Sequence, residues 1–145
     1  MLTYDPRSIS SLVYQNLAQL KQSVAQEAAQ KEQKGQAVEL YTYTATWGLL
    51  RLKAEEFALQ SQPNKQRVVQ RFFSILGELV FPETPGRFQG EAGLQYLSNR
   101  NQLSASEYLG LTGVALQVAR EFSFWAEALY PKSPTSSNSS GEGDS

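Results

Sequence analysis

The chain of 145 residues is 41% hydrophobic and 11% aromatic, which is enough apolar material for the core of one domain. Its 13 Lys and Arg against 14 Asp and Glu give a formal charge of −1, which argues against a DNA-wrapping or polybasic membrane-binding protein. Because the chain has no cysteine and no histidine, thiol catalysis, disulfides, thiolate metal sites, Ser-His-Asp triads and His-ligated metals are excluded.

The first helix is indicated by Asp5 and Pro6, which are typical of an N-cap and a first helical position. The residues that follow at helical spacing are Ile9, Leu12, Val13, Asn16, Leu17, Leu20 and Val24. Residues 21–36 are rich in Ala, Gln, Glu and Lys, so they favour a helix but offer almost nothing to a core. We expect this stretch to project into solvent and to break at Gly35.

A second helical segment is predicted over residues 36–62. Its YTYTATW stretch also fits a strand, because β-branched and aromatic residues alternate there, but helical spacing continues without a turn signal. Pro63 and Asn64 mark the stop. The strongest pattern covers residues 64–81, where two adjacent apolar rows predict a central helix with a wide buried face.

The last third of the chain predicts a loop and two more helices. Residues 82–93 are rich in proline and glycine and form the loop, and a short helix follows over residues 94–97. Ser104 and Glu107 have the spacing of a capping box that opens the last helix, and Pro131 ends it. The expected fold is therefore all-α, a compact bundle of five or six helices without a sheet.

We expect a helical domain over residues 1–130 and a disordered tail over residues 131–145. The tail is rich in Ser, Gly and Pro and has no apolar residue, so nothing offsets the entropy of ordering it. The first ten residues lack the pattern of a signal peptide, and no run approaches the ~18 apolar residues of a membrane span. The expected location is the cytoplasm, with no membrane partner.

A basic cluster is the first candidate for a binding site. Its members lie in one stretch that holds only two acids, and they are Arg51, Lys53, Lys65, Arg67 and Arg71. Arg67 and Arg71 are one helical turn apart, so their guanidinium groups can project together, and arginine binds phosphate oxygens bidentately. The alternative is an ordinary solvated helix face whose charges pair with Glu55 or Glu78.

The last helix carries a second candidate, a surface for a protein partner. Gly110 and Gly113 share one side of it with Gln117, and each glycine costs about 1 kcal/mol relative to alanine inside a helix. Such a strip suggests close approach of another backbone, from a neighbouring helix of the same chain, which we favour, or from another subunit. Phe124 and Trp125 stand beside the core row, and one of them is expected to face a groove or a partner.

Catalysis is not expected from this chain. Acid–base chemistry would fall to carboxylates, lysine or tyrosine, and the densest acids do not converge on a metal or a substrate by their spacing. These acids are Glu55, Glu56, Glu121 and Glu127. We therefore predict no enzymatic activity, no metal site and no cofactor.

Two stretches carry a resemblance to a known family. Residues 40–49 read LYTYTATWGL, with a Leu and a Gly-Leu pair at the family's spacing, and Phe57 follows further on. Residues 107–112 read EYLGLT, and after them come Phe122, Phe124-Trp125 and the sequence AEAL at 126–129. In these residues the chain resembles the small helical subunit of type III-B CRISPR–Cas effectors, the Cmr complexes.

The resemblance implies a non-catalytic subunit of an RNA-guided antiviral assembly. Copies would stack head to tail in a minor filament beside the other Cmr subunits and would contact the backbone of the guide–target RNA duplex without reading bases. The basic cluster would supply this contact, and nuclease and cyclase activities would belong to other subunits. The alternative is a helical adaptor that binds a protein through Gly110, Gly113 and Trp125 and has no nucleic-acid role.

Overall fold

The computed structural model describes residues 6–132. In chain order its elements are α1 (Pro6–Gln22), α2 (Glu27–Trp47), α3 (Leu49–Ala58), α4 (Pro63–Val80), the 3-10 helix η1 (Pro85–Phe88), α5 (Gly90–Ser98) and α6 (Ala105–Leu129). No strand occurs in this range, so the predicted all-α bundle of five or six helices without a sheet is confirmed for it. The predicted N-cap Asp5 and all but two residues of the predicted tail lie outside the described residues.

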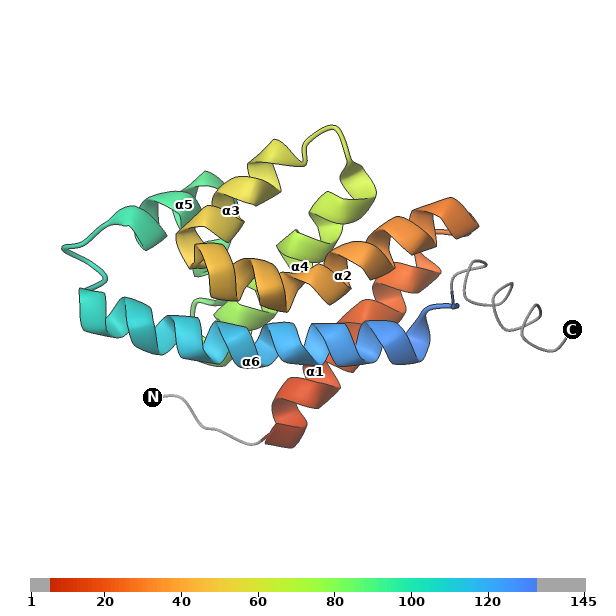
Figure 1. Cartoon of the computed structure of the whole chain (residues 1–145). Coiled ribbons are helices and arrows are strands. Elements are labelled where there is room, and N and C mark those ends of the chain that lie inside the picture. Colours follow the sequence, from red (N-terminus) through yellow and green to blue (C-terminus); the bar gives the residue numbers. More distant parts are fainter. Residues whose placement is uncertain (1–5, 133–145) are drawn as a thin grey trace, which may run out of the picture.

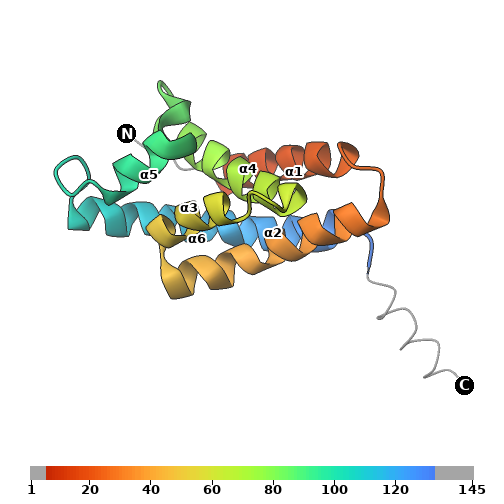
Figure 2. The same ribbon diagram turned by 90° about the horizontal axis from the view of Figure 1, so that it is seen from above.

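α2 and α6 run antiparallel and side by side (Figure 1 and Figure 2). At one end the Tyr130 hydroxyl donates to Gln33 Oε1 over 2.7 Å. Further along, Arg120 Nη2 donates to the Tyr41 hydroxyl over 3.0 Å. These contacts between residues far apart in the sequence fix the register of the two helices.

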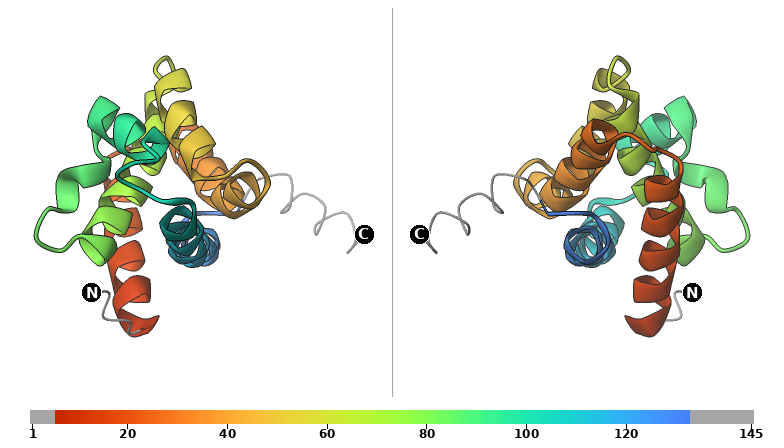
Figure 3. Two further views of the ribbon diagram at one scale, coloured as in Figure 1. Left: turned by 90° about the vertical axis from the view of Figure 1, so that its left-hand side faces the viewer. Right: turned by 90° about the vertical axis from the view of Figure 1, so that its right-hand side faces the viewer.

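α1 lies on the side of α6 opposite to α2 (Figure 3). Ser10 donates from its hydroxyl to Glu121 Oε1, and the rings of Tyr14 and Trp125 have their centroids 5.1 Å apart. α4 contacts α1, α2, α3 and α6 and is the central helix of the bundle, as its sequence predicts. No helix within residues 6–132 combines the length and the hydropathy that a membrane crossing requires.

The two apolar rows predicted on α4 form the middle of the core. Six of their side chains have no exposed surface, and they are Val68, Val69, Phe72, Phe73, Ile75 and Leu76. Phe72 packs edge-on against Phe122 of α6, with ring centroids 5.8 Å apart. Complete burial of one such side chain stabilises the fold by about 1.5–3 kcal/mol. α4 therefore contributes most of its stabilisation through these residues, at the place where it meets the other helices.

The predicted break at Gly35 is wrong. α2 begins at Glu27 and continues through Gly35, where a Cβ would meet nothing within 4 Å. The same stretch contributes to the interior, because the side chains of Gln33 and Gln36 are buried. The hydrogen bond from Tyr130, which directly follows α6, explains how an amide can hold this end of α2 in place of an apolar side chain.

The single helix predicted over residues 36–62 is divided at Gly48. Its φ of +88° and ψ of 171° lie in a region that is essentially restricted to glycine, so α2 ends here and α3 begins. The first N–H groups of a helix lack partners within it, and the Tyr108 hydroxyl accepts a hydrogen bond from the amide of Leu50 over 2.9 Å. Tyr108 belongs to α6, so the acceptor that supports this break is distant in sequence.

The predicted loop and short helix are also revised. η1 lies within the loop, and α5 begins at Gly90 instead of residue 94. The loop approaches α4 so closely that a Cβ on Gly77 would clash with the carbonyl oxygen of Pro85. The capping box of α6 is confirmed, because Ser104 Oγ accepts from the Glu107 amide at 3.1 Å and Glu107 Oε1 accepts from the Ser104 amide at 2.9 Å.

Candidate functional site

The five predicted basic residues lie in different surroundings. Arg67 is exposed and Arg71 is half-buried, both on α4. Lys65 is half-buried in the first turn of the same helix, and Arg51 is exposed on α3. Lys53 is only 1% exposed. The structure therefore brings Arg67 and Arg71 together but does not join all five in one surface.

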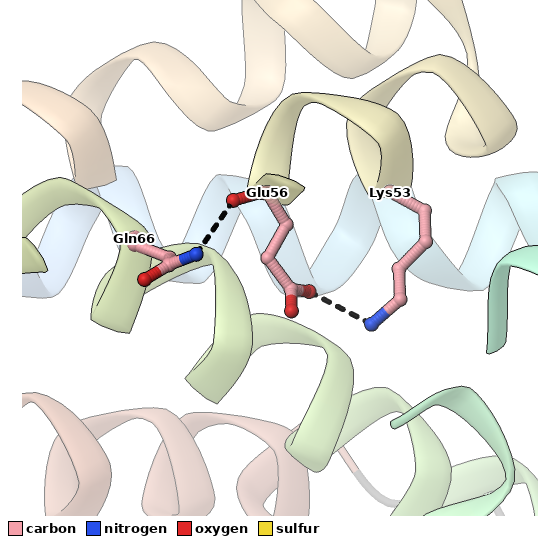
Figure 4. Close-up of polar contacts among 3 residues, drawn as sticks. All are labelled: Lys53, Glu56 and Gln66. Carbon is pink, nitrogen blue, oxygen red and sulfur yellow. Dashed lines mark hydrogen bonds and ion pairs between the residues drawn. The ribbon is translucent and has the colours of Figure 1, made fainter. Parts of the chain in front are cut away.

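Lys53 belongs to the core, which corrects its assignment to a phosphate-binding surface. Its ammonium donates to Glu56 Oε1 over 2.7 Å (Figure 4). The same ammonium lies 4.8 Å from the centre of the Phe73 ring. Gln66 of α4 donates to the main-chain oxygen of Glu56 over 2.9 Å, so the same group of residues ties α3 to α4 (Figure 4). A ligand outside the bundle cannot reach this ammonium.

Arg51 lies at the corner between α2 and α3, beside aromatic and acidic side chains. Its guanidinium carbon is 4.6 Å from the centre of the Trp47 ring. The Tyr43 hydroxyl donates to Glu55 Oε1 over 3.3 Å, and burial, followed by the negative charge of Glu55, raises the pKa of Tyr43. Arg51 thus packs against a ring, and its positive charge acts on Tyr43 by opposing the rise of the pKa of that hydroxyl.

A polar hollow of about 340 Å³ lies between α1 and α4, and we call it the α1–α4 hollow. The described residues that line it are Leu20, Ser23, Arg67, Gln70, Arg71, Ser74 and Gln89. The four that α4 supplies are spaced by three and four positions, so they share one face of the helix. None of the seven is acidic, and two of them carry a positive charge.

Arg71 is held in place by two amides of α1. Its Nη1 donates to Asn16 Oδ1 and to Gln19 Oε1, each over 2.9 Å. Asn16 is itself oriented, because its Nδ2 donates to the carbonyl oxygen of Leu12 over 2.8 Å. Both acceptors are uncharged, so the positive charge of Arg71 is positioned without being neutralised.

Arg67 lies one turn before Arg71 and makes no hydrogen bond or ion pair with residues 6–132. Its guanidinium can therefore move toward a ligand in the α1–α4 hollow. An arginine offers five N–H donors and no acceptor, so the group that fits between the two side chains is an anion. The arrangement supplies charge and hydrogen-bond donors at one point on the surface.

The predicted partner-binding residues lie on an open side of α6. Gly110 and Gly113 are exposed, and a Cβ on either would meet nothing within 4 Å. The favoured explanation, close approach of a neighbouring helix of the same chain, is therefore wrong for the described residues. Gln117 is exposed, and Trp125 is half-buried.

Trp125 forms an aromatic surface together with Tyr14 of α1 and Phe124. The ring centroid of Trp125 lies 5.1 Å from that of Tyr14 and 5.1 Å from that of Phe124. The Trp125 Nε1 donates to Glu121 Oε1 over 3.2 Å. Phe124 is 60% exposed and Tyr14 is 44% exposed. Gly110, in contrast, borders an apolar hollow of about 360 Å³ lined mainly by the ends of α4 and α6 and by Tyr96.

The residues that position Arg71 beside the α1–α4 hollow were missed from the sequence. Asn16 and Gln19 lie more than 50 positions before Arg71, and no local pattern links them to it. One signal was present, because Asn16 is the single polar residue in the apolar row of the first helix. A polar residue at such a position predicts a hydrogen-bond partner on the helix that it faces.

Comparison with known proteins does not assign a function, so a functional assignment depends on the geometry of the site. No protein-family model, no curated protein and no solved structure matches the chain. Within residues 6–132, no three Asp or Glu side chains gather where they could hold a metal ion. What the site offers is two arginines with polar, uncharged neighbours, and separately an exposed aromatic surface.

Proposed function

We propose that the chain is a non-catalytic small subunit of a type III-B CRISPR–Cas effector, a Cmr complex, in the cytoplasm. It would join a minor filament of further copies beside the other Cmr subunits and contact the backbone of the guide–target RNA duplex. The observation that carries the proposal is the α1–α4 hollow, where Arg67 and Arg71 offer donors for an anion and no described lining residue is acidic.

The two stretches that carry the family resemblance support the assignment, because they meet in the fold. Gly48 of the Gly-Leu pair lies beside Tyr108 of the EYLGLT stretch, whose hydroxyl accepts a hydrogen bond from the amide of Leu50. α2 and α6, on which most of these residues lie, run side by side (Figure 2). The resemblance thus covers one structural unit instead of unrelated segments.

Contact with RNA would involve the accessible members of the basic cluster, Arg67 and Arg71 first, with Arg51 and Lys65 further away. Each copy would neutralise only a few phosphates, so the isolated chain is expected to bind RNA weakly. Repetition along a filament would raise the affinity, because every further contact becomes intramolecular. The formal charge of −1 agrees with a local contact and not with wrapping of nucleic acid.

Co-expression with the other Cmr subunits tests the proposal. We expect the chain to co-purify with them in a fixed ratio, and failure to join a complex that otherwise assembles would overturn the assignment. Gly113→Arg tests the predicted partner surface of α6, and Gly35→Arg is the matched control, because both glycines are exposed with open space around them. Loss of assembly is expected for Gly113→Arg alone.

A helical adaptor without a nucleic-acid role is the second candidate, and the exposure of Tyr14 and Phe124 favours it. Such a protein would bind its partner through the aromatic surface or the glycine side of α6. The two functions differ in one measurement. Both arginines, Arg67 and Arg71, are replaced by Glu. If the chain is an effector subunit, the assembled complex should bind RNA more weakly. If the chain is an adaptor, the affinity of the complex for RNA and the salt dependence of that affinity should be unchanged.

A further inference from the structure

We propose that the α1–α4 hollow is a preorganised site for a single phosphate group of a nucleic-acid backbone. Arg71 and Arg67 would bind the charged oxygens of this phosphate from two directions, and Asn16 and Gln19 would act as positioning residues for Arg71. The inference deepens the proposed function and rests on it only for the source of the phosphate, an RNA strand. The observation beneath it is the pair of 2.9 Å hydrogen bonds that hold Arg71 from α1.

The first step concerns the donors of Arg71. Its Nη1 carries two hydrogens and makes two hydrogen bonds, to Asn16 and to Gln19. The hydrogens on Nη2 and Nε, which form the other edge of the guanidinium, have no partner among the described residues. Such an edge presents two parallel donors, which is the arrangement that binds two oxygens of one phosphate.

The second step concerns entropy. A free arginine side chain loses rotamer freedom when it binds, and this loss reduces its affinity for a ligand. Arg71 has already lost that freedom in the folded protein, because α1 holds it through an asparagine that is itself tied to the carbonyl of Leu12. Binding therefore needs little further ordering of this side chain.

The third step selects phosphate among anions. Side chains one helical turn apart have Cβ atoms about 5–6 Å from each other, so Arg67 and Arg71 can approach one small anion from two directions. A carboxylate holds its two oxygens in one plane, which a single guanidinium covers. The two charged oxygens of a backbone phosphate belong to a tetrahedral group and each accepts more than one hydrogen bond, so Arg67 and the hydroxyl of Ser74, which also lines the hollow, can reach the same oxygens from another direction.

The fourth step selects a backbone phosphate. None of the described residues that line the hollow is aromatic, so no ring is available on which a nucleobase could stack. Leu20 is the single apolar residue among them. A ligand held here would be recognised through its phosphate alone, which suits contact with an RNA strand independent of sequence.

The inference is tested on the full chain by nitrogen-15 NMR of the arginine Nε–H groups. Three ligands would be titrated separately: inorganic phosphate, uridine monophosphate and a short single-stranded oligouridylate. We expect the signals of Arg71 and Arg67 to shift with all three, and the oligouridylate to bind most tightly. If uridine monophosphate binds as tightly as the oligouridylate, the assignment to a backbone phosphate is overturned.

Matched variants separate a built site from general charge attraction. Arg71→Gln should lower the affinity for oligouridylate about tenfold to a hundredfold, because a charged donor pair is lost. Arg71→Lys keeps the charge but loses the two parallel donors, and Asn16→Ala frees the side chain, so each should lower it by a smaller factor of about three to ten. Arg100→Gln removes an exposed arginine outside the hollow and should have almost no effect.

Two results would overturn the inference. One is an equal loss of affinity in Arg100→Gln and Arg71→Gln, and the other is unchanged affinity in Arg71→Gln and Arg67→Gln. Thermal unfolding of each variant shows whether it is folded, and Arg71→Lys provides a milder change if Arg71→Gln is not. Co-purification with Cmr subunits is a separate readout. Its failure would overturn the proposed function, whereas the titrations alone decide whether the phosphate site exists.

Discussion

Lys53 brings a full positive charge into the interior of the bundle, next to the rings of Phe57 and Phe73. Its partner Glu56 is also buried, and the two charged atoms are 2.7 Å apart. Transfer of two ions out of water is expensive, and their attraction roughly offsets that cost. The pair therefore adds little to stability as a whole, although each member depends strongly on the other.

This dependence gives a prediction for two substitutions. Glu56→Gln leaves a buried ammonium without its counterion and should lower the free energy of unfolding by about 3–5 kcal/mol. Replacement of both residues, Lys53→Met with Glu56→Leu, removes both charges and should cost far less. Urea denaturation followed by circular dichroism measures the difference between the two proteins.

The control for this measurement is the ion pair between Lys34 and Glu127, where the glutamate side chain is 62% exposed. Glu127→Gln should change the free energy of unfolding by less than about 1 kcal/mol, because solvent screens the pair. Equal costs for Glu56→Gln and Glu127→Gln would show that the charge of Lys53 reaches solvent after all.

Tyr130 predicts a loss of stability at alkaline pH. Burial raises the pKa of its hydroxyl above the ordinary value of 10.0, so the folded protein keeps a proton that the unfolded chain releases. This contribution is complete below about pH 10 and declines at higher pH, by up to about 1.4 kcal/mol per pH unit. Tyr130→Phe should be less stable at neutral pH, because it loses the hydrogen bond to Gln33, and should lose less on going to about pH 11.

Denaturant titrations at about pH 8 and about pH 11 check this expectation. Titration of other groups, including Tyr43, whose pKa is also raised, lowers the stability of both proteins as the pH rises. The informative quantity is therefore the difference between wild type and Tyr130→Phe at each pH. A difference that stays constant across this range would mean that the Tyr130 hydroxyl titrates equally in the folded and unfolded chains.

At the scale of the elements, glycines determine where helices begin and end, but only where the backbone demands it. Gly48 has a φ of +88° and separates α2 from α3, whereas Gly35 lies inside α2 in ordinary helical surroundings. Their roles cannot be told apart from the residue type, because both are glycines inside segments whose apolar residues keep helical spacing. The difference comes from the turn at Gly48 and from Tyr108 of α6, which accepts a hydrogen bond from the first turn of α3.

Opposite effects are therefore expected from the same substitution at the two positions. Gly48→Ala forces a side chain into a conformation that costs of order 1–3 kcal/mol, and the protein should be destabilised by that amount. Gly35→Ala removes a flexible residue from a helix interior where a Cβ has open space, and it should stabilise by about 0.5–1 kcal/mol. Thermal unfolding of the two variants gives the sign directly. Stabilisation by Gly48→Ala would mean that α2 and α3 join into one helix.

At the scale of the whole molecule, much of the fold followed from local patterns. The capping box at Ser104 and the two buried rows of α4 depend on residues a few positions apart, and both were predicted correctly. The division at Gly48 and the burial of Lys53 were missed, because each depends on a partner or a face that periodicity of apolar residues does not record. The spacing of Arg67 and Arg71 was visible in the sequence, whereas the amides that position Arg71 come from another helix.

Uneven packing predicts uneven stability across the molecule. α4 contacts α1, α2, α3, α6 and η1, whereas the neighbours of α5 are chiefly α3 and η1. α5 also buries little, with Gly93 and Leu97 as its buried residues, while α4 buries six large apolar side chains of its two rows. Local opening of α5 therefore exposes much less apolar surface than opening of α4.

Native-state hydrogen exchange should show this difference. The amides in the middle of α4 and of α6 are expected to exchange only through global unfolding, and those of α5 at least about tenfold faster through local opening. Low concentrations of denaturant should speed exchange in α4 and leave α5 nearly unchanged, because little surface is exposed when α5 opens. Equal rates with equal denaturant dependence would mean that α5 unfolds only together with α4, in a single cooperative unit that the contacts of α5 do not explain.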